Sequence, residues 1–352
     1  IAALLAEERA MLERTAERVR RFAEAQRATL TDLDTPIPGG RAGHTVAPVE
    51  RAGCYAPGGR YPLPSSVLMT VIAARAAGVR EVWVATPRPD PVLLAAAAVA
   101  GADGLFAVGG AQAIAALAYG AGPVPRCDLI VGPGNRWVTA AKRIVAGDVG
   151  IDMLAGPSEL VVVADDAADP ALVAADLLAQ AEHDIDALPV LITPSEKLAD
   201  AVDRTLCDQL TTLPTRATAE AALAGGYTVI TPDLNEAFAT ADRIAPEHLQ
   251  LSVADPDAAA AAIRHAGALF LGEGSAEVFG DYGAGPNHVL PTGGAARYTA
   301  GLSVFTFLRP RSWLRVDDPA LLASDSAGLG RMEGLEAHAR AAEARRLKPL
   351  SS

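Results

Sequence analysis

The sequence has 352 residues and a net charge of −12, and half of its residues are hydrophobic. Its length suggests about two domains, each with enough apolar material for a sizeable core. The negative charge, with no basic stripe to neutralise phosphates, argues against a nucleic-acid-binding protein, and no apolar run is long enough to span a membrane.

Three cysteines, Cys54, Cys127 and Cys207, are scattered along the chain, and no Cys-x-x-Cys motif occurs. This usage is typical of a reducing compartment, and it argues against both a disulfide framework and a zinc site made of thiolates. No signal peptide is predicted at the start of the sequence. We therefore expect a cytoplasmic protein.

The first predicted element is a long charged helix over residues 2–29, whose apolar side chains follow roughly one stripe. Such a helix needs a surface to lie on, which is either the body of the chain or another subunit. Residues 31–64 are rich in proline and glycine, and they contain two short strand-like runs, 44–49 and 52–56.

Strands and helices then alternate along two successive stretches of the chain. In the first stretch, strands are predicted at 81–86, 104–108 and 127–131, and helices at 65–77, 91–100, 111–119 and 136–146. In the second stretch, strands are predicted at 159–164, 190–193, 227–231, 248–253 and 268–271, and helices at 170–184, 195–210, 217–223, 234–241 and 256–265. This alternation predicts parallel sheets with helices on their faces.

A glycine-rich segment at 272–294, a strand-like run at 302–308 and a helical tail at 318–347 complete the predicted elements. The expected fold class is therefore α/β, with two tandem incomplete Rossmann-like units and helical N-terminal and C-terminal extensions. The expected domains are an N-terminal helical extension, a first α/β unit, a second α/β unit and a C-terminal helical tail, at 1–30, 31–158, 159–310 and 311–352.

No Gly-x-Gly-x-x-Gly motif lies between a strand and a helix, so the standard dinucleotide fingerprint is absent. In its place, three glycine-rich segments lie at or near strand ends in the first unit, at 55–59, 108–112 and 132–135. Backbone amides and a helix N-terminus at such junctions can bind a phosphate. Tight turns explain any one of these segments, whereas the three together are equally consistent with a nucleotide site.

A candidate metal site begins with Gln180 and His183, which are three residues apart and share a face if the helix predicted at 170–184 forms. An amide oxygen and an imidazole side by side supply half of a metal site. Alone, the pair is better explained as a polar helix end. Asp281 lies in the unusual glycine-rich segment at 280–294 and offers a carboxylate oxygen as a third ligand.

Glu247 and His248 are adjacent at the start of a predicted strand, and together they offer two proton-transfer groups. A polar strand entry explains the pair equally well. Adjacent side chains on an extended strand point in opposite directions, so both face one substrate only if the backbone turns there. Pro246 favours such a turn because it fixes its own φ and restricts the preceding residue.

Taken together, these segments closely resemble the histidinol dehydrogenase family from about residue 30 to residue 340. The resemblance rests on four specific motifs: Ala-Gly-Pro-Ser-Glu at 155–159, Gln-Ala-Glu-His-Asp at 180–184, Ala-Pro-Glu-His-Leu at 245–249, and the segment from Gly-Asp-Tyr to Asn-His-Val-Leu-Pro-Thr at 280–292. It implies that the first α/β unit binds NAD, that the second carries zinc and the catalytic residues, and that the C-terminal tail makes dimer contacts.

The resemblance also implies roles for individual residues. Zinc would be bound by four residues, Gln180, His183, Asp281 and the tail residue His338. The catalytic pair would be Glu247 and His248. The substrate would contact the zinc ligands and His248, and also Ser158, His288 and Glu333. The implied NAD contacts are Tyr55, Gln112 and Asn135.

The implied activity is the oxidation of L-histidinol to L-histidine with two NAD molecules, the last step of histidine biosynthesis. His248 would take the hydroxyl proton in the first oxidation, and Glu247 would activate water for attack on an aldehyde that stays in the site. Zinc would hold the substrate as a template. Family members are homodimers in which the tail histidine enters the partner's site, so we expect a homodimer with tail exchange.

Two alternatives remain open at this point. One is a related dehydrogenase of the same superfamily that acts on another small polyol, such as a sulfonated propanediol. The other is a non-catalytic scaffold that binds a nucleotide or a metal, although the intact set of proton-transfer groups argues against it.

Overall fold

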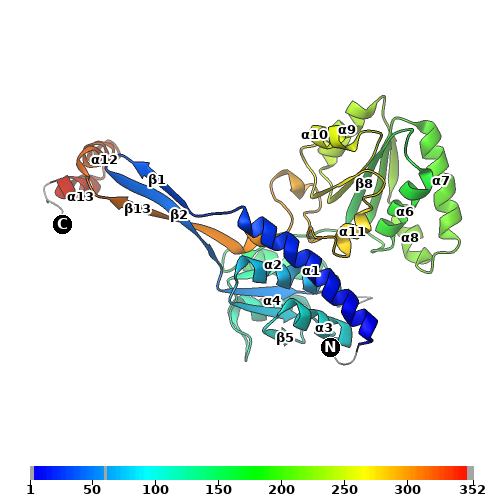
Figure 1. Cartoon of the computed structure of the whole chain (residues 1–352), viewed down its shortest axis with the longest axis horizontal. Helices are drawn as coiled ribbons and strands as arrows, with labels where there is room; N and C mark the ends of the chain where they lie inside the picture. The colour runs from blue at the N-terminus through cyan, green and yellow to red at the C-terminus, as the bar shows by residue number, and fades with distance from the viewer. Residues whose placement is uncertain (1–3, 59–61, 347–352) are drawn as a thin grey trace. The chain divides into compact units, whose positions relative to one another are not determined.

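The computed structural model describes residues 4–58 and 62–346 of the chain (Figure 1). The chain divides into two compact units. The first unit consists of residues 1–27 and 49–307, and the second consists of residues 28–48 and 308–352.

The first unit contains two parallel sheets of five strands each. The strands of the first sheet are β3 (Arg51–Tyr55), β4 (Glu81–Ala85), β5 (Gly104–Phe106), β6 (Leu129–Val131) and β7 (Gly150–Ile151), in the order β5-β4-β3-β6-β7. Its helices are α2 (Pro64–Ala77), α3 (Pro91–Ala100), α4 (Gly110–Tyr119) and α5 (Arg136–Val145). The order places the first two crossovers on one side of β3 and the next two on the other, as in doubly wound nucleotide-binding folds.

The second sheet repeats this strand order. Its strands are β8 (Glu159–Ala164), β9 (Leu188–Thr193), β10 (Tyr227–Ile230), β11 (His248–Ser252) and β12 (Ala268–Leu271), in the order β10-β9-β8-β11-β12. Its helices are α6 (Pro170–Ala181), α7 (Glu196–Leu210), α8 (Arg216–Leu223), α9 (Leu234–Ile244), α10 (Pro256–Ala262) and the short α11 (Glu277–Asp281).

The surroundings of the central strand β8 explain why it is apolar from Leu160 to Ala164. Leu160 and Val162 pack in one hydrophobic cluster, and Val161 and Val163 pack in another. Because side chains alternate along a strand, the two clusters lie on opposite faces of the sheet. A parallel sheet covered by helices on both faces requires such a continuous apolar run.

Short polar residues start the helices of the second sheet. Asp169, Ser195, Asp233 and Asp255 each accept a hydrogen bond from a backbone N–H in the first turn of the helix that follows. These caps satisfy donors that have no partner within the helix. Because of these caps, the predicted starts of these helices agree with the structure to within a residue or two. The end of α6 agrees less well, because the helix ends at Ala181, three residues before the predicted end.

Helix α1 (Ala6–Ala28) is the long charged helix predicted at the N-terminus. Its buried residues, Leu12, Ala16, Val19 and Ala23, recur at helical spacing. Arg18 Nε donates to the carbonyl oxygen of Gly283 at 2.7 Å, and a Cβ at Gly283 would lie 2.3 Å from the Thr15 side chain. The helix therefore packs on the body of the first unit, against the loop that follows Asp281.

The second unit is an antiparallel sheet with two helices. Strands β1 (Leu33–Ile37), β2 (Gly40–Pro48) and β13 (Leu308–Val316) pair in the order β1-β2-β13, followed by α12 (Ala320–Met332) and α13 (Glu336–Arg346). Figure 1 shows β2 and β13 running side by side over their full length.

This unit differs from the predicted boundaries. Residues 31–48, which the sequence places with the first α/β unit, pair instead with β13 near the other end of the chain. The strand-like run at 302–308 becomes the short helix η2 (Val304–Phe307), and β13 begins only at Leu308. A pairing between strands about 270 residues apart leaves no signal in local periodicity, because periodicity reports burial and not the partner.

The predicted α/β fold class is confirmed by the two helix-covered parallel sheets. Another short helix, η1 (Ala295–Arg297), lies in the segment between β12 and η2. None of the described helices has both the length and the apolar character needed to cross a membrane.

Candidate active site

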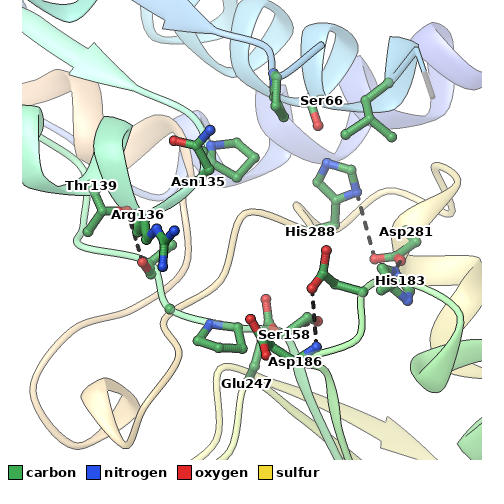
Figure 2. Close-up of a pocket in the computed structure, with 18 of the residues that line it drawn as sticks. Ser66, Asn135, Arg136, Thr139, Ser158, His183, Asp186, Glu247, Asp281 and His288 are labelled. Atoms are coloured by element: carbon green, nitrogen blue, oxygen red, sulfur yellow. Dashed lines mark hydrogen bonds and ion pairs between the residues drawn. The ribbon is translucent and has the colours of Figure 1, made fainter. Parts of the chain in front are cut away.

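A cavity of about 940 Å³ lies within the first unit. Residues that follow the carboxyl ends of the first sheet's strands line one part of it, including Asn135 and Arg136. Residues at the amino ends of the second sheet's strands line another, including Ser158 and Glu247. In the view of Figure 2, Asn135 lies above the cavity and Ser158 and Glu247 lie below it. The volume is large enough for a small-molecule ligand.

The backbone turns sharply just before Glu247 and His248. Ala245, which ends α9, has φ of 54° and is the only described non-glycine residue with positive φ. Pro246 follows, and its carbonyl oxygen accepts the N–H of Gly267 at 2.9 Å. Both Glu247 and His248 line the cavity, so the turn brings adjacent side chains to one space. The turn expected at Pro246 is therefore present, and the residue with the left-handed backbone is Ala245, just before the proline.

The Glu247 carboxyl group is held firmly on one oxygen. Ser158 Oγ donates to Glu247 Oε2 at 2.7 Å, and the Glu159 N–H donates to the same oxygen at 2.9 Å. Burial raises the pKa of Glu247 to about 8, against the effect of these two hydrogen bonds, which lower it. The group therefore holds a proton at neutral pH and becomes a base as the pH passes about 8.

The two ring nitrogens of His248 differ, because Nδ1 has a hydrogen-bond partner and Nε2 has none among the described residues. Its Nδ1 lies 3.0 Å from the carbonyl oxygen of Glu159, which only accepts hydrogen bonds, so Nδ1 carries the proton in the neutral ring. The buried Nε2 has no hydrogen-bond partner within the described part of the chain. It lies 3.9 Å from Asp281 Oδ1. The Nε2 lone pair is thus free to accept a proton.

Three side chains near this pair form a candidate metal cluster. One ligand atom each from His183, Glu277 and Asp281 lie within 4.8 Å of one another. His183 Nε2 is 3.2 Å from Asp281 Oδ2, and its Nδ1 lies 3.0 Å from the Ala179 carbonyl oxygen. A backbone carbonyl on the second ring nitrogen is the usual way in which a metal-binding histidine is oriented.

Gln180 lies one turn before His183, although His183 itself falls just beyond the end of α6. A backbone hydrogen bond of 3.3 Å from His183 N–H to the Gln180 carbonyl oxygen continues the helical path. The Gln180 side chain is fully buried, and neither amide atom has a partner among the described residues. An unpartnered buried amide is costly, whereas a metal ligated through its oxygen would satisfy it.

The charges of the cluster also fit a cation. Glu277 is completely buried, has no hydrogen-bond partner in the described chain, and has a pKa raised to about 7 by burial. Burial lowers the pKa of His183, but the Asp281 hydrogen bond and nearby carboxylates outweigh it and raise the pKa to about 9. Two carboxylates and an imidazole nitrogen are donors that a divalent cation such as zinc accepts.

Glu277 is the candidate site residue that the sequence prediction missed. It precedes Asp281 by four residues, so the two share a face of α11. The segment singled out in the sequence begins at residue 280, so Glu277 lies just outside it. His288, which the resemblance assigns to the substrate, lines the cavity with Nδ1 at 3.7 Å from Asp281 Oδ1, and burial lowers its pKa.

The residues expected to contact NAD occupy different surroundings. Asn135 caps α5, where its Oδ1 accepts N–H groups from Trp137 and Val138, and it lines the cavity. Tyr55 is buried, and its hydroxyl accepts the N–H of Gly110 at 3.1 Å. Gln112 is exposed on the first turn of α4. Of these expected contacts, Asn135 alone is among the described residues that line this cavity.

The two expected site residues of the tail belong to the second unit. Glu333 ends α12, and His338 lies in the first turn of α13. Both are exposed, and neither is among the residues that line the cavity.

Comparison with known proteins gives consistent matches. A family model described as histidinol dehydrogenase matches residues 1–346. The histidinol dehydrogenase of Thermus thermophilus is 55% identical over 311 residues, covering 88% of this chain and 76% of that protein. That of Cereibacter sphaeroides is 49% identical over 352 residues, covering 98% and 81%. The crystal structure of histidinol dehydrogenase from Elizabethkingia anophelis matches with a TM-score of 0.91 at 33% identity, covering 99% of this chain and 85% of that one.

Proposed function

Because the chain belongs to the histidinol dehydrogenase family, we propose that it oxidises L-histidinol to L-histidine with two NAD molecules, as the last step of histidine biosynthesis. The observation that supports this proposal is that the candidate proton-transfer residues and the candidate metal ligands line the same cavity. Glu247 and His248 lie beside His183 and Asp281, and the same cavity extends to Asn135. Proton transfer, metal binding and cofactor binding thus have neighbouring candidates.

His248 serves the first oxidation, in which the alcohol becomes an aldehyde. Its Nε2 takes the hydroxyl proton, while the Glu159 carbonyl holds Nδ1–H and keeps the ring oriented. NAD supplies the hydride-accepting chemistry in this oxidation and in the next. The buried position of His248, whose side chain is 3% exposed, limits competing proton exchange with solvent.

Glu247 serves the second oxidation, which first requires water to add to the aldehyde. Ser158 and the Glu159 N–H bind Oε2, which leaves Oε1 to accept a proton from that water. Oxidation of the hydrate then gives the carboxylate and a second hydride. The aldehyde stays in the cavity between the two steps, so the same buried pair acts on both.

We propose that zinc is bound by Gln180, His183, Asp281 and His338 of the partner subunit. When bound, zinc would act as a template for the imidazole and amine of the substrate. The unpartnered Gln180 amide and the carbonyl-oriented His183 ring support this ligand set. Glu277 adds a second carboxylate beside the site and balances the charge of the cation.

We further propose a homodimer in which the tails are exchanged, so that His338 and Glu333 complete the partner's site. A test is to mix a His338→Ala subunit with a His183→Ala subunit under conditions of subunit exchange. One of the two sites in each mixed dimer then keeps all of its ligands, and part of the activity should return. No recovery, despite confirmed exchange, would contradict a site shared between subunits.

The substrate is tested by NADH formation with L-histidinol and, as a matched alternative, with a sulfonated propanediol. We expect two NADH per histidinol and none from the diol. Turnover of the diol alone would assign the chain to another substrate, and no turnover of either with zinc present would favour a binding scaffold.

A further inference from the structure

A buried ion pair lies in the first α/β sheet and has no part in the chemistry described above. Lys142 on α5 and Asp152, just after β7, pair through Lys142 Nζ and Asp152 Oδ1. Their side chains are only 3% and 1% exposed. A pair this deep loses the hydration of both charges, so it requires additional hydrogen bonds to be maintained.

Those additional bonds converge on one residue, Gly132. Lys142 Nζ donates to the Gly132 carbonyl oxygen at 3.0 Å. The Gly132 N–H donates to Asp152 Oδ2 at 2.7 Å. Asp152 Oδ1 also accepts the N–H of Met153 at 2.6 Å. The ion pair therefore binds both backbone polar groups of Gly132, the N–H and the carbonyl oxygen. It connects the end of β6 to α5 and to the residue after β7.

Gly132 begins the turn at 132–135, which follows the carboxyl end of β6. Its φ of +110° suits glycine alone, and a Cβ there would lie 2.1 Å from the carbonyl oxygen of Tyr55. The next three residues, Pro133, Gly134 and Asn135, all line the cavity. Asn135 in turn caps α5, the helix that carries Lys142. The buried pair thus lies directly behind a part of the cavity wall, although neither of its residues lines the cavity.

We propose that Lys142 and Asp152 are positioning residues for NAD binding, which hold the turn at 132–135 in the shape that receives the cofactor. This inference rests on the proposed function. A turn fixed before binding loses less conformational freedom when the ligand arrives, and this strengthens binding without any direct contact. The turn also lies at the edge of the sheet where doubly wound folds bind nucleotides, between the first and fourth strands.

A second ion pair in the same α/β half serves as a control, with side chains that are more exposed, at 28% and 42%. Arg75 and Asp103 form an ion pair in which Arg75 donates to the carbonyl oxygens of Gly101, Val79 and Arg80, and Asp103 accepts the N–H of Val82. This pair also ties helices to a strand through backbone groups. Neither of its residues lines the cavity. Removing Arg75 weakens the same α/β half without releasing the turn.

The test measures the Kd of NAD for the zinc-loaded protein by equilibrium titration, following the fluorescence of exposed Trp137 or the heat of binding. The variants are Lys142→Met, the neutral pair Lys142→Met with Asp152→Asn, and the control Arg75→Met. The neutral pair leaves no unpaired buried charge, so it is expected to fold if the single variant does not. Melting temperature, zinc content and the KM for histidinol are measured for each variant.

We expect Lys142→Met and the neutral pair to raise the Kd and KM of NAD by about tenfold or more, because the released turn must then be ordered when the cofactor binds. The KM for histidinol, kcat at saturating NAD and zinc content should stay near those of the parent. Arg75→Met should lower the melting temperature and leave NAD binding unchanged.

An unchanged Kd for NAD in either folded Lys142 variant would overturn the inference, as would an equal rise in Arg75→Met. Failure of both Lys142 variants to fold would assign the pair to stability alone. If the parent protein neither binds NAD nor reduces it with histidinol, the proposed function is what fails. The two failures are therefore distinguishable.

Discussion

The two parallel sheets of the first unit have the same strand order but use opposite ends. In the first sheet, the segments that follow the carboxyl ends of β3 and β6 line the cavity. In the second sheet, the cavity is lined by Ser158, just before β8, and by Glu247 and His248 at the start of β11. These residues lie at the amino ends of the strands.

The carboxyl ends of the second sheet are closed by its own side chains. Asp165 follows β8, and its two carboxylate oxygens accept the N–H groups of Ala167 and Ala254 at 3.0 and 2.9 Å. Ser195 donates to Asp166 in the neighbouring loop. Hydrogen bonds between loops therefore cross the end of the sheet where this topology usually binds a ligand.

The two sheets therefore show that strand order alone does not determine at which end of a sheet the cavity-lining residues lie. The first sheet offers glycine-rich turns and a helix N-terminus, which suit a cofactor. The second sheet offers a left-handed turn at Ala245 that brings two proton-transfer groups to its other end. Function depends on which end of a sheet is left open and on which side chains stand there.

The largest effect is expected from removing a metal ligand at the amino end of the second sheet. His183→Asn should lose activity and metal affinity by more than about a hundredfold, since even loss of an outer partner costs about ten- to a hundredfold. Metal content of the purified variant checks this. The control is His265→Asn, at a histidine in the loop between α10 and β12 that does not line the cavity, and this variant should retain its metal. Full zinc content in His183→Asn would reject the assignment.

A second effect is the dependence of the aldehyde oxidation on pH. Burial raises the pKa of Glu247 to about 8, and only the deprotonated carboxylate accepts a proton from water. Below pH 8 the base is lost as pH falls, so the rate should drop by about tenfold per pH unit, and it should level off above pH 8. The measurement is the pH profile of NADH formation from the aldehyde at saturating NAD. A rate independent of pH between about 6 and 8 would exclude this role.

The smallest kinetic effect is expected at the closed end of the second sheet. Asp165→Asn weakens two charge-assisted hydrogen bonds and should lower the free energy of unfolding by about 1–2 kcal/mol. Values of kcat and KM should not change, because Asp165 does not line the cavity. Denaturant unfolding and steady-state kinetics check both parts. A large loss of kcat in the folded variant would show that the carboxyl end of this sheet does take part in function.

Local sequence signals account for most of the two α/β sheets. Apolar runs such as β8 predict strands, and capping residues such as Asp169 and Asp233 predict helix starts. Each of these signals is contained in a few consecutive residues. The pairing of β2 with β13 could not be predicted in this way, because hydrophobic periodicity does not identify a distant partner. The boundary of the second unit was missed for the same reason.

The candidate site was only partly accessible from sequence. The motifs around Gln180, Glu247 and Asp281 are local and specific, and the structure places residues of all three in one region of the first unit. Glu277 was missed although it is four residues from Asp281, because a single glutamate on a short helix carries no signal until its burial is known. The hydrogen bonds of Arg18 to Gly283 and of Lys142 to Gly132 depend on tertiary packing alone.

The central claim is that Glu247 and His248, adjacent in the chain, divide the two oxidations between them. The most direct test is the number of NADH molecules formed per histidinol in a single turnover of Glu247→Gln. This variant keeps the shape of the side chain but loses its base, which typically costs about a hundred- to ten-thousandfold in rate. His248→Asn, the matched control, should slow the first hydride transfer instead.

We predict that Glu247→Gln forms one NADH at close to the parent rate and then stalls, and that it oxidises directly supplied aldehyde slowly. Two NADH per histidinol at the parent rate would show that Glu247 is not the water-activating base, and would contradict the account.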